Sequence, residues 1–223
     1  PHDLAYAIRQ VVTNAHVVGI RGPYTLMALE NIGALHPNLT ISGDPGLLWE
    51  APDSEALETE EKTLPQLAVN WGTANNNVLG RNEKATAKAV AQSLKKFTDR
   101  FSVLIYPMWH KDVEHCHALN KELGQSNNVK VVEELPTPME LMGIYKQSVC
   151  SINMKLHANI FSAALGCPFI SVAYRWKCLD FAESVSCKSW AIPFDDSELS
   201  TRLVTVLEDI TSNLPRSKEH LEL

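Results

Sequence analysis

The sequence lacks several features that would by themselves assign it to a class. Its 223 residues contain no apolar run near the roughly 18–20 residues that cross a bilayer, so we predict no transmembrane segment. Basic residues do not outnumber acidic ones, with 20 Lys and Arg against 26 Asp and Glu and a net charge of −6. Because nucleic acids and anionic membranes are bound through an excess of Lys and Arg, we expect no nucleic-acid partner.

Cysteine is scarce, and its spacing forms no recognisable motif. The five cysteines include no C-x-x-C, and an odd number at irregular spacing does not build a disulfide framework. Reduced and mostly buried thiols are typical of cytosolic proteins, so we predict a cytoplasmic location. The first four residues, Pro-His-Asp-Leu, also lack both a Met and the basic-then-apolar profile of a signal peptide. We therefore expect the chain to begin partway through a longer protein.

The chain does contain a regular alternation of strand and helix patterns. Short apolar runs bounded by loops predict buried strands at residues 67–71, 101–106, 129–132, 149–152, 168–172 and 190–192. Apolar residues at three- and four-residue steps predict helices at 83–97, 113–123, 136–145, 156–165, 179–185 and 199–210. Continuous apolar strands that alternate with helices indicate a parallel sheet covered on both faces. The predicted fold class is α/β, with a doubly wound, Rossmann-like domain built on that parallel sheet.

The residues before this alternation form a segment of a different kind. A strand is predicted at 17–20, a helix at 24–33 and another strand at 39–41, which together make a partial α/β unit. An acidic, weakly apolar stretch follows them. We therefore divide the chain into a remnant of an N-terminal α/β domain at 1–53, an acidic linker at 54–65, the Rossmann-like domain at 66–212 and a polar tail at 213–223.

The loops that follow the strands are the candidate site, because open parallel sheets bind ligands beyond the carboxyl ends of their strands. After the first strand come Asn70, Trp71 and Gly72, in a Gly- and Asn-rich loop that leads to a helix N-terminus. Free backbone N–H groups at such a place suit a phosphate or a carboxylate. The sequence has no G-x-G-x-x-G motif and no P-loop, so an ordinary surface loop stays the alternative.

Two polar residues after the second strand, His110 and Asp112, are expected at the same edge. Asp112, His115 and Cys116 share a helical face at i, i+3 and i+4, a spacing that a metal site could use. Cys116 also lies on the apolar stripe of this predicted helix, which favours a core position for it. We therefore predict no metal site and no cofactor, and keep His110 and Asp112 as candidate substrate-binding residues.

Cationic and aromatic residues follow the fourth and fifth strands. Lys155 and His157 open a helix, where the lysine and the helix N-terminus could hold an anion while the imidazole exchanges a proton. A capped helix with a half-buried histidine is the alternative. Tyr174 and Lys177 come after the fifth strand and could stack on a sugar and pair with an anion. An ordinary exposed helix start would place the same residues there.

Four motifs in a fixed order add to this interpretation. They are I-R-G-P-Y-T at 20–25, G-D-P-G-L-L at 43–48, M-K-L-H-A-N-I-F at 154–161 and G-C-P-F-I at 166–170. Together they resemble the polysaccharide pyruvyltransferase family, whose pattern is V-R-G/D-x-x-S/T, G-D-P-A, S-M-R-L-H-x-x-I-F and G-V-P. The family's next segment, aromatic-Asp-x-Lys, is matched in part at 174–177. The resemblance extends from about residue 17 to residue 181, and its specificity comes from the ordered set.

The resemblance implies an architecture similar to that of GT-B glycosyltransferases, of which this chain would supply the C-terminal half. It also implies transfer of the pyruvyl unit of phosphoenolpyruvate to a saccharide acceptor as a ketal, with release of phosphate. By motif, Arg21 and Lys155 would bind the phosphoenolpyruvate anion, and His157 would be the catalytic acid and base. Lys155 stands where the family has arginine, and Arg175 stands where it has aspartate. The first difference keeps the charge but loses the bidentate guanidinium.

Two other functions remain open at the level of sequence, a nucleotide-sugar glycosyltransferase of similar architecture and a sugar- or anion-binding module without catalysis. The oligomeric state also stays open, with a homo-oligomer among the alternatives. All functional hypotheses share one geometric expectation. His157, Lys155, Asn70, Asp112 and Tyr174 should cluster at the carboxyl edge of one parallel sheet, because each lies just after a predicted strand or at its end.

Overall fold

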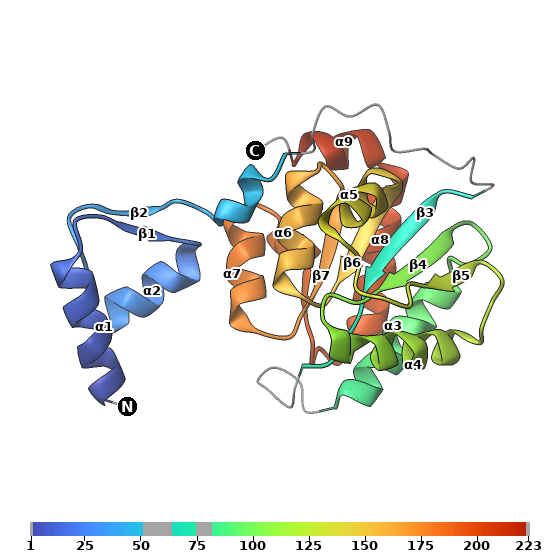
Figure 1. Ribbon diagram of the computed structural model, residues 1–223, viewed down its shortest axis with the longest axis horizontal. Coiled ribbons are helices and arrows are strands. Elements are labelled where there is room, and N and C mark those ends of the chain that lie inside the picture. Colours follow the sequence, from blue (N-terminus) through green and yellow to red (C-terminus); the bar gives the residue numbers. More distant parts are fainter. Residues whose placement is uncertain (1, 51–63, 75–81, 222–223) are drawn as a thin grey trace.

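The computed structural model describes residues 2–50, 64–74 and 82–221. Its main element is a six-stranded parallel sheet with the strand order β5-β4-β3-β6-β7-β8 (Figure 1). The strands are β3 (Gln66–Asn70), β4 (Ser102–Tyr106), β5 (Val129–Val131), β6 (Ser148–Asn153), β7 (Phe169–Ala173) and β8 (Ala191–Pro193). The chain runs outward from β3 to β5 and then crosses back to β6, so the strand order reverses between β3 and β6. This arrangement confirms the predicted α/β, doubly wound fold.

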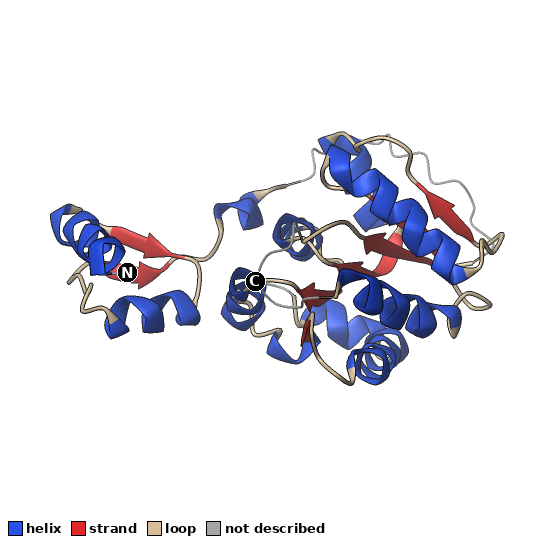
Figure 2. Cartoon of the chain, turned by 90° about the horizontal axis from the view of Figure 1, so that it is seen from below, coloured by secondary structure: helices blue, strands red, loops and turns tan. Residues whose placement is uncertain are grey.

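Helices cover both faces of the sheet (Figures 1 and 2). One face carries α3 (Glu83–Lys95), α4 (Val113–Leu123) and α8 (Leu199–Ser212), and the other carries α5 (Pro138–Lys146), α6 (Leu156–Ala164) and α7 (Trp176–Ser184). The helices bury both faces of the strands, as β3 shows, because all five of its residues are buried. Because side chains alternate along a strand, Leu67 and Val69 join the larger apolar cluster, whereas Ala68 joins the cluster under α5.

The face under α5 and α6 also contains a chain of buried hydroxyl and amide groups. The Tyr106 and Tyr145 hydroxyls lie 2.7 Å apart, and Tyr145 donates to the Ala158 carbonyl in the first half of α6 at 2.9 Å. Ser151 of β6 and Ser162 of α6 are joined at 2.7 Å. Buried polar groups must be paired to avoid a desolvation cost, so this network fixes α6 against the sheet. The start of α6, where Lys155 and His157 lie, is thereby held in place.

A second, smaller part of the chain precedes the sheet and projects from it (Figure 1). It consists of α1 (His2–Asn14), β1 (Val18–Ile20), α2 (Pro23–Asn31) and β2 (Leu39–Ile41), and β1 pairs with β2 in parallel. The 3₁₀ turn η1 (Pro45–Leu48) then leads back to α6. The two strands and α2 match the predicted elements, whereas α1 and η1 were not predicted. We call residues 2–41 the N-terminal unit.

The end of the chain and the start of α7 also differ from expectation. Residues 213–223 were predicted to be a polar tail, but α9 (Leu214–Glu219) forms there, and Ser217 and Leu221 are buried. Helix α7 begins at Trp176, three residues before the predicted start. The predicted acidic linker at 54–65 lies almost wholly outside the described residues. Within the described ranges, no helix combines the length and the apolar character needed to cross a bilayer.

Candidate functional site

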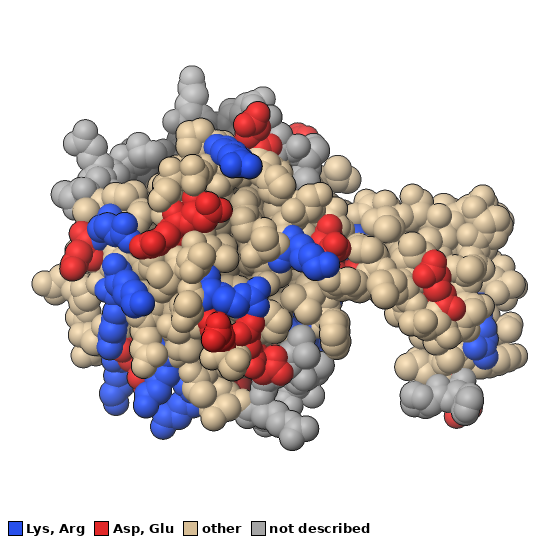
Figure 3. Space-filling view, turned by 180° about the vertical axis from the view of Figure 1, so that it is seen from behind, with Lys and Arg blue, Asp and Glu red and all other residues tan. Residues whose placement is uncertain are grey.

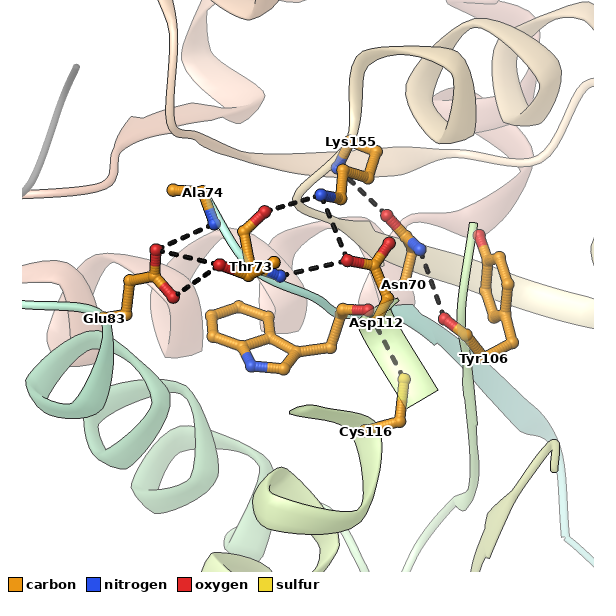
Figure 4. A network of polar contacts seen from close by, with 9 residues as sticks. Asn70, Thr73, Ala74, Glu83, Tyr106, Asp112, Cys116 and Lys155 are labelled. Atoms are coloured by element: carbon orange, nitrogen blue, oxygen red, sulfur yellow. Dashed lines mark hydrogen bonds and ion pairs between the residues drawn. The ribbon is translucent and has the colours of Figure 1, made fainter. Parts of the chain in front are cut away.

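Four of the five residues expected to cluster do lie together at the carboxyl edge of the sheet. The backbone N–H of Lys155 donates to Asn70 Oδ1 at 3.0 Å, and Lys155 Nζ lies 3.2 Å from Asp112 Oδ1 (Figure 4). The same ammonium lies 5.6 Å from the centroid of the Tyr174 ring. The ends of β3, β6 and β7 and the turn after β4 therefore meet around the Lys155 side chain.

At the end of β3, the side chains of Asn70 and Trp71 are buried and contact other residues of the protein. Asn70 is fully buried, and its Nδ2 donates to the Tyr106 carbonyl at 3.2 Å. Both the oxygen and the nitrogen of its side-chain amide therefore make hydrogen bonds within the protein. Trp71 is 3% exposed and stacks on Phe194, with ring centroids 6.3 Å apart. These positions correct the expectation that the Asn70 and Trp71 side chains bind substrate. Gly72 lies against the Asp112 carboxylate so closely that a Cβ atom would collide with it.

Asp112 and Lys155 form a buried ion pair at the centre of the site (Figure 4). Asp112 is fully buried, and its Oδ1 also accepts from the Thr73 N–H at 3.1 Å. Lys155 donates to the Thr73 carbonyl at 2.6 Å. Asp112 Oδ2 is buried and has no hydrogen-bond partner among the residues that the structure describes. The carboxylate thus holds both the lysine and the loop after β3, which explains why glycine precedes Thr73.

Glu83 in the first turn of α3 fixes the other side of that loop. It accepts from the Ala74 N–H at 2.9 Å and from Thr73 Oγ1 at 3.0 Å (Figure 4). Glu83 was not among the predicted site residues, although an acid in the first turn of a helix that follows a Gly- and Asn-rich loop was a usable signal. The rest of that loop, at 75–81, lies outside the described residues.

Cationic side chains surround Tyr174, which follows β7. The centroid of its ring lies 5.2 Å from the Arg175 guanidinium carbon, 5.6 Å from Lys155 Nζ and 5.9 Å from Lys177 Nζ. Burial lowers the pKa of Lys177, and the positive charges of Arg175, Arg21 and Lys155 lower it further. Because like charges disfavour one another's charged forms, the lowered pKa is the expected effect of cations placed near Lys177. We call Arg21, Lys155, Arg175 and Lys177 the cationic cluster.

His157 lies beside this cluster, on the exposed surface of the first turn of α6. Its ring stacks on Phe161, with centroids 6.0 Å apart, and its charge acts on Asp44 by lowering the pKa of that carboxyl group. In the described parts of the chain, no hydrogen bond or ion pair joins His157 to Asp112 or Tyr174. Because its side chain is exposed, the imidazole is open to a ligand.

Arg21 is held by an acid that the sequence analysis did not select. Arg21 Nε donates to Asp44 Oδ2 at 2.7 Å, and the Gly46 N–H donates to Asp44 Oδ1 at 3.0 Å. Burial alone would raise the pKa of Asp44, but the Gly46 N–H and the Arg21 guanidinium more than offset it, so the pKa is lowered. Asp44 belongs to the G-D-P motif at 43–45, which was the signal available in the sequence.

The segment that carries Arg21 is attached to α7 through Asp180, another acid that was missed. Asp180 is 3% exposed and accepts from the Tyr24 N–H at 2.8 Å, the Thr25 N–H at 3.3 Å and Thr25 Oγ1 at 2.5 Å. It thus caps α2 from a distance of 155 residues in sequence, because the N-cap residue Gly22 has no side chain for the purpose. No local pattern in the sequence could have indicated this contact.

The remaining predicted residues do not extend the cluster. His110 is exposed at the start of the 3₁₀ turn η2 (His110–Asp112), and in the described structure it makes no hydrogen bond or ion pair with the other site residues. Cys116 is buried, and burial raises the pKa of its thiol to about 12, so it is a neutral donor to the Trp71 carbonyl. The described residues contain no group of three His, Cys, Asp or Glu side chains able to hold a metal ion.

An apolar groove is lined in part by Phe161, the residue on which His157 stacks. Its volume is about 570 Å³, and its lining includes Leu48, Trp49, Met108, Leu135, Leu141 and Phe161. Trp49 and Phe161 contact each other with ring centroids 4.6 Å apart. Phe161 therefore connects the groove with the imidazole of His157.

Comparison with known proteins gives one family and a set of similar folds. The model of the family described as polysaccharide pyruvyl transferase matches residues 1–175. The S. aureus MnaA–UDP co-structure has a TM-score of 0.65 at 7% sequence identity, covering 93% of this chain and 53% of that chain. The Thermobaculum terrenum O-GlcNAc transferase has a TM-score of 0.52 at 12% identity, covering 77% of this chain and 33% of that chain.

A further solved structure has the same architecture, the UDP-GlcNAc 2-epimerase from Neisseria meningitidis bound to UDP-GlcNAc. Its TM-score is 0.51 at 12% identity, covering 71% of this chain and 39% of that chain. At such identities the likeness shows the fold alone. The chain spans between about a third and about half the length of these structures. No curated protein sequence matches this chain.

Proposed function

The chain belongs to the polysaccharide pyruvyl transferase family, and from this premise we propose that it transfers the pyruvyl group of phosphoenolpyruvate to a saccharide as a ketal, with release of phosphate. The observation that carries the proposal is the arrangement at the start of α6. There an exposed imidazole, His157, lies two residues from Lys155 in the cationic cluster, at a helix N-terminus. Such a place suits a small substrate with two anionic groups.

The cations would bind and orient the donor. Phosphoenolpyruvate carries a carboxylate and a phosphate, and Lys155 and Arg21 are two cations that neighbouring carboxylates hold. Asp112 and Asp44 hold these two side chains in place, so their positions are set before the substrate binds. The first N–H groups of α6 add further donors, because no side chain caps this helix in the described structure.

His157 would move the protons of the reaction. A protonated imidazole gives its proton to the methylene carbon of the enol, and a saccharide hydroxyl attacks the adjacent carbon, which bears the carboxylate and the phosphate. The imidazole accepts the proton of that hydroxyl. The bond between this carbon and the phosphate oxygen then breaks, and a second hydroxyl closes the ketal. Of the two hydroxyl protons, one ends on the new methyl group and the other on the released phosphate, so the reaction balances.

The test is phosphate release from phosphoenolpyruvate with substituted proteins. His157→Ala should lower turnover by about 100-fold or more, the usual scale for a general acid or base, with little change in the Michaelis constant. Lys155→Ala should mainly raise the Michaelis constant, and Lys155→Arg should keep or improve binding, since a guanidinium binds an oxyanion with two donors. His117→Ala is the matched control, because His117 is exposed on α4 and pairs with Glu133. Parental turnover in His157→Ala would contradict the proposed role.

The similarity to nucleotide-bound structures supports a second candidate, a nucleotide-sugar glycosyltransferase. The MnaA structure contains UDP, and the Neisseria meningitidis enzyme contains UDP-GlcNAc. Thermal unfolding distinguishes the candidates, since a ligand of the folded protein raises the midpoint. Protection by UDP but not by phosphoenolpyruvate would favour the glycosyltransferase. Protection by phosphoenolpyruvate without phosphate release would favour a non-catalytic binding module.

A further inference from the structure

The loop after β3 and the turn after β6 meet at the point where the strand order of the sheet reverses. β3 lies between β4 and β6, and Asn70 at its end is in register with Tyr106 of β4 and with Asn153 of β6. The helix that follows β3 covers one face of the sheet, and the helix that follows β6 covers the other (Figure 1). Ligands of open α/β sheets bind in the crevice between two such diverging segments, so the contacts that join them set the geometry of the site.

Residues 70–73 accept three hydrogen bonds from the turn after β6. The Met154 N–H donates to the Asn70 carbonyl at 3.1 Å, and the Lys155 N–H donates to Asn70 Oδ1 at 3.0 Å. The Lys155 ammonium donates to the Thr73 carbonyl at 2.6 Å. Two of these acceptors are backbone carbonyls, which any residue would supply. The bond to Oδ1 is the one that depends on the amino acid at position 70.

The other end of the Asn70 amide is attached to β4. Its Nδ2 donates to the Tyr106 carbonyl at 3.2 Å. Exchange of the amide oxygen and nitrogen would break this bond and the bond from Lys155, so the oxygen is held facing Lys155. Asn70 is fully buried, where an apolar side chain would avoid the cost of taking an amide out of water. What the amide contributes here is a fixed geometry.

The residue held by this amide decides where α6 begins. Lys155 is the N-cap of α6 and has an extended backbone, so its N–H lies outside the hydrogen bonds of the helix. In the described structure no side chain caps α6. His157 lies two residues farther on, in the first turn. A shift of the Lys155 backbone would therefore move the imidazole with it.

We propose that Asn70 is a positioning residue, whose side-chain amide fixes the backbone of Lys155 and thereby the place of the His157 imidazole. This inference rests on the proposed function, in which His157 moves the protons. Asn70 itself is buried and acts only through the start of α6. Because a displacement of about 1 Å can cost roughly 100-fold in rate, Asn70→Ala should lower kcat with phosphoenolpyruvate by at least about tenfold.

Gln66→Ala is the matched control for the loss of a buried amide. Gln66 lies at the opposite end of β3, about 13 Å from Asn70, and its Nε2 donates to Ser148 Oγ of β6 at 2.9 Å. The two substitutions should lower the midpoint of urea unfolding by similar amounts. Gln66→Ala should leave kcat within about twofold of the parent, because its amide joins β3 to β6 at the far edge of the sheet.

A second background separates positioning from a general loss of folded protein. In a chain that already carries His157→Ala, Asn70→Ala should lower kcat by no more than about twofold, since no imidazole remains to be misplaced. A purely structural effect would lower turnover by the same factor in both backgrounds. Asn70→Leu keeps the branched shape of the side chain and removes both polar atoms, so it serves as the test variant if Asn70→Ala does not fold.

Hydrogen exchange of the whole chain tests the same contact without turnover. Electron-transfer fragmentation resolves the amides of Met154 and Lys155, and the ratio of their exchange rates cancels a change in global stability that affects both. Asn70→Ala removes the acceptor of the Lys155 N–H and leaves that of the Met154 N–H in place. The ratio of the Lys155 rate to the Met154 rate should rise about tenfold, the scale of one hydrogen bond, and stay at the parental value in Gln66→Ala.

The outcomes separate this inference from the proposed function. A parental exchange ratio in Asn70→Ala would overturn the inference, whatever the activity. Parental kcat in Asn70→Ala, or an equal loss of kcat in Gln66→Ala, would also overturn it. If the exchange ratio rises as expected while the parent releases no phosphate from phosphoenolpyruvate, Asn70 does fix the start of α6, and the proposed reaction is what fails.

Discussion

At the scale of single residues, carboxylates hold two of the four cations of this site in place. Asp112 holds Lys155 at 3.2 Å, Asp44 holds Arg21 at 2.7 Å, and Asp180 accepts three hydrogen bonds at the start of α2. An isolated surface lysine or arginine samples many rotamers, and a substrate must then bear the entropy of ordering it. Here the carboxylates have already fixed these side chains in the folded protein.

The contribution of Asp44 to the stability of the fold depends on pH, and the sign of this dependence follows from its lowered pKa. A carboxyl group with a pKa below its usual value of 3.8 stabilises the fold fully above that value, and the contribution is lost as the pH falls through the lower folded value. Asp44→Asn should therefore be less stable than the parent at pH 7, and the difference should shrink toward acid pH. Urea unfolding at both ends of this range measures it.

The control for that measurement is Asp99→Asn, which alters an exposed carboxylate and should change the free energy of unfolding by about 0.5 kcal/mol or less. A deficit of Asp44→Asn that stayed constant from neutral to acid pH would contradict the ion pair with Arg21 as its source. Loss of the hydrogen bond from the Gly46 N–H would not explain such a deficit, since an asparagine carbonyl can still accept it.

The sequence identified the site residues that lie next to strand ends and missed those that act across the fold. Asn70, Asp112, Lys155 and Tyr174 could be placed because the carboxyl ends of parallel strands meet at one edge. Asp180 could not be identified from the sequence, because its hydrogen-bond partners lie about 155 residues away and the local pattern shows only a helix. Trp71 was expected to face a ligand, but its large apolar surface is better buried against Phe194.

At the scale of elements, the strands and most helices followed from the apolar pattern, and the exceptions have physical causes. Helix α7 was expected to start at 179, and Arg175 before its actual start is a poor N-cap by propensity. It starts at Trp176 all the same, since tertiary packing of Cys178 and Phe181 fixes the first turns. Helix α9 was missed because its polar sequence gives no periodic signal, and contacts with the rest of the fold bury Ser217.

The contact between α2 and α7 is the element-level feature that bears most on function. Asp180→Ala would remove the acceptor of the Tyr24 and Thr25 N–H groups and of the Thr25 hydroxyl. We expect a loss of about 1–3 kcal/mol in the free energy of unfolding, the cost of leaving such donors unsatisfied. Because this contact also places the segment with Arg21, KM for phosphoenolpyruvate should rise with little change in kcat.

Urea unfolding and steady-state phosphate release check this expectation. Glu208→Ala is the control, because Glu208 pairs with Arg100 at an exposed site 3.3 Å away, and such a pair contributes about 1 kcal/mol or less. If Asp180→Ala were as stable as Glu208→Ala, the hydrogen bonds at the start of α2 would not be what attaches the N-terminal unit.

At the scale of the whole molecule, the two parts of the chain differ in how much apolar surface they bury. In the N-terminal unit, Leu4, Tyr6, Val11 and Leu35 are each at least 58% exposed. The buried apolar residues of this unit are three, Val12, Ile20 and Ala34, whereas the six-stranded sheet is apolar on both faces. Figure 3 shows few charged side chains on the visible face of the projecting unit, and interspersed acids and bases on the main body.

This contrast predicts that the two parts open separately. Burial of apolar surface is the main favourable term in folding, and the N-terminal unit, with its two-stranded sheet and three buried apolar residues, has little of it. In native-state hydrogen exchange, amides of β1 and β2 should therefore exchange through a low-energy opening, and those of β3, β6 and β7 only through global unfolding. Peptide-level mass spectrometry over time resolves the two groups, and added urea should accelerate exchange in β3, β6 and β7 much more than in β1 and β2.

Exchange of β1 and β3 with the same free energy and the same urea dependence would show that the α2–α7 contact joins both parts into one cooperative unit. In that case Asp180→Ala should separate them, because it removes the hydrogen bonds that make this contact.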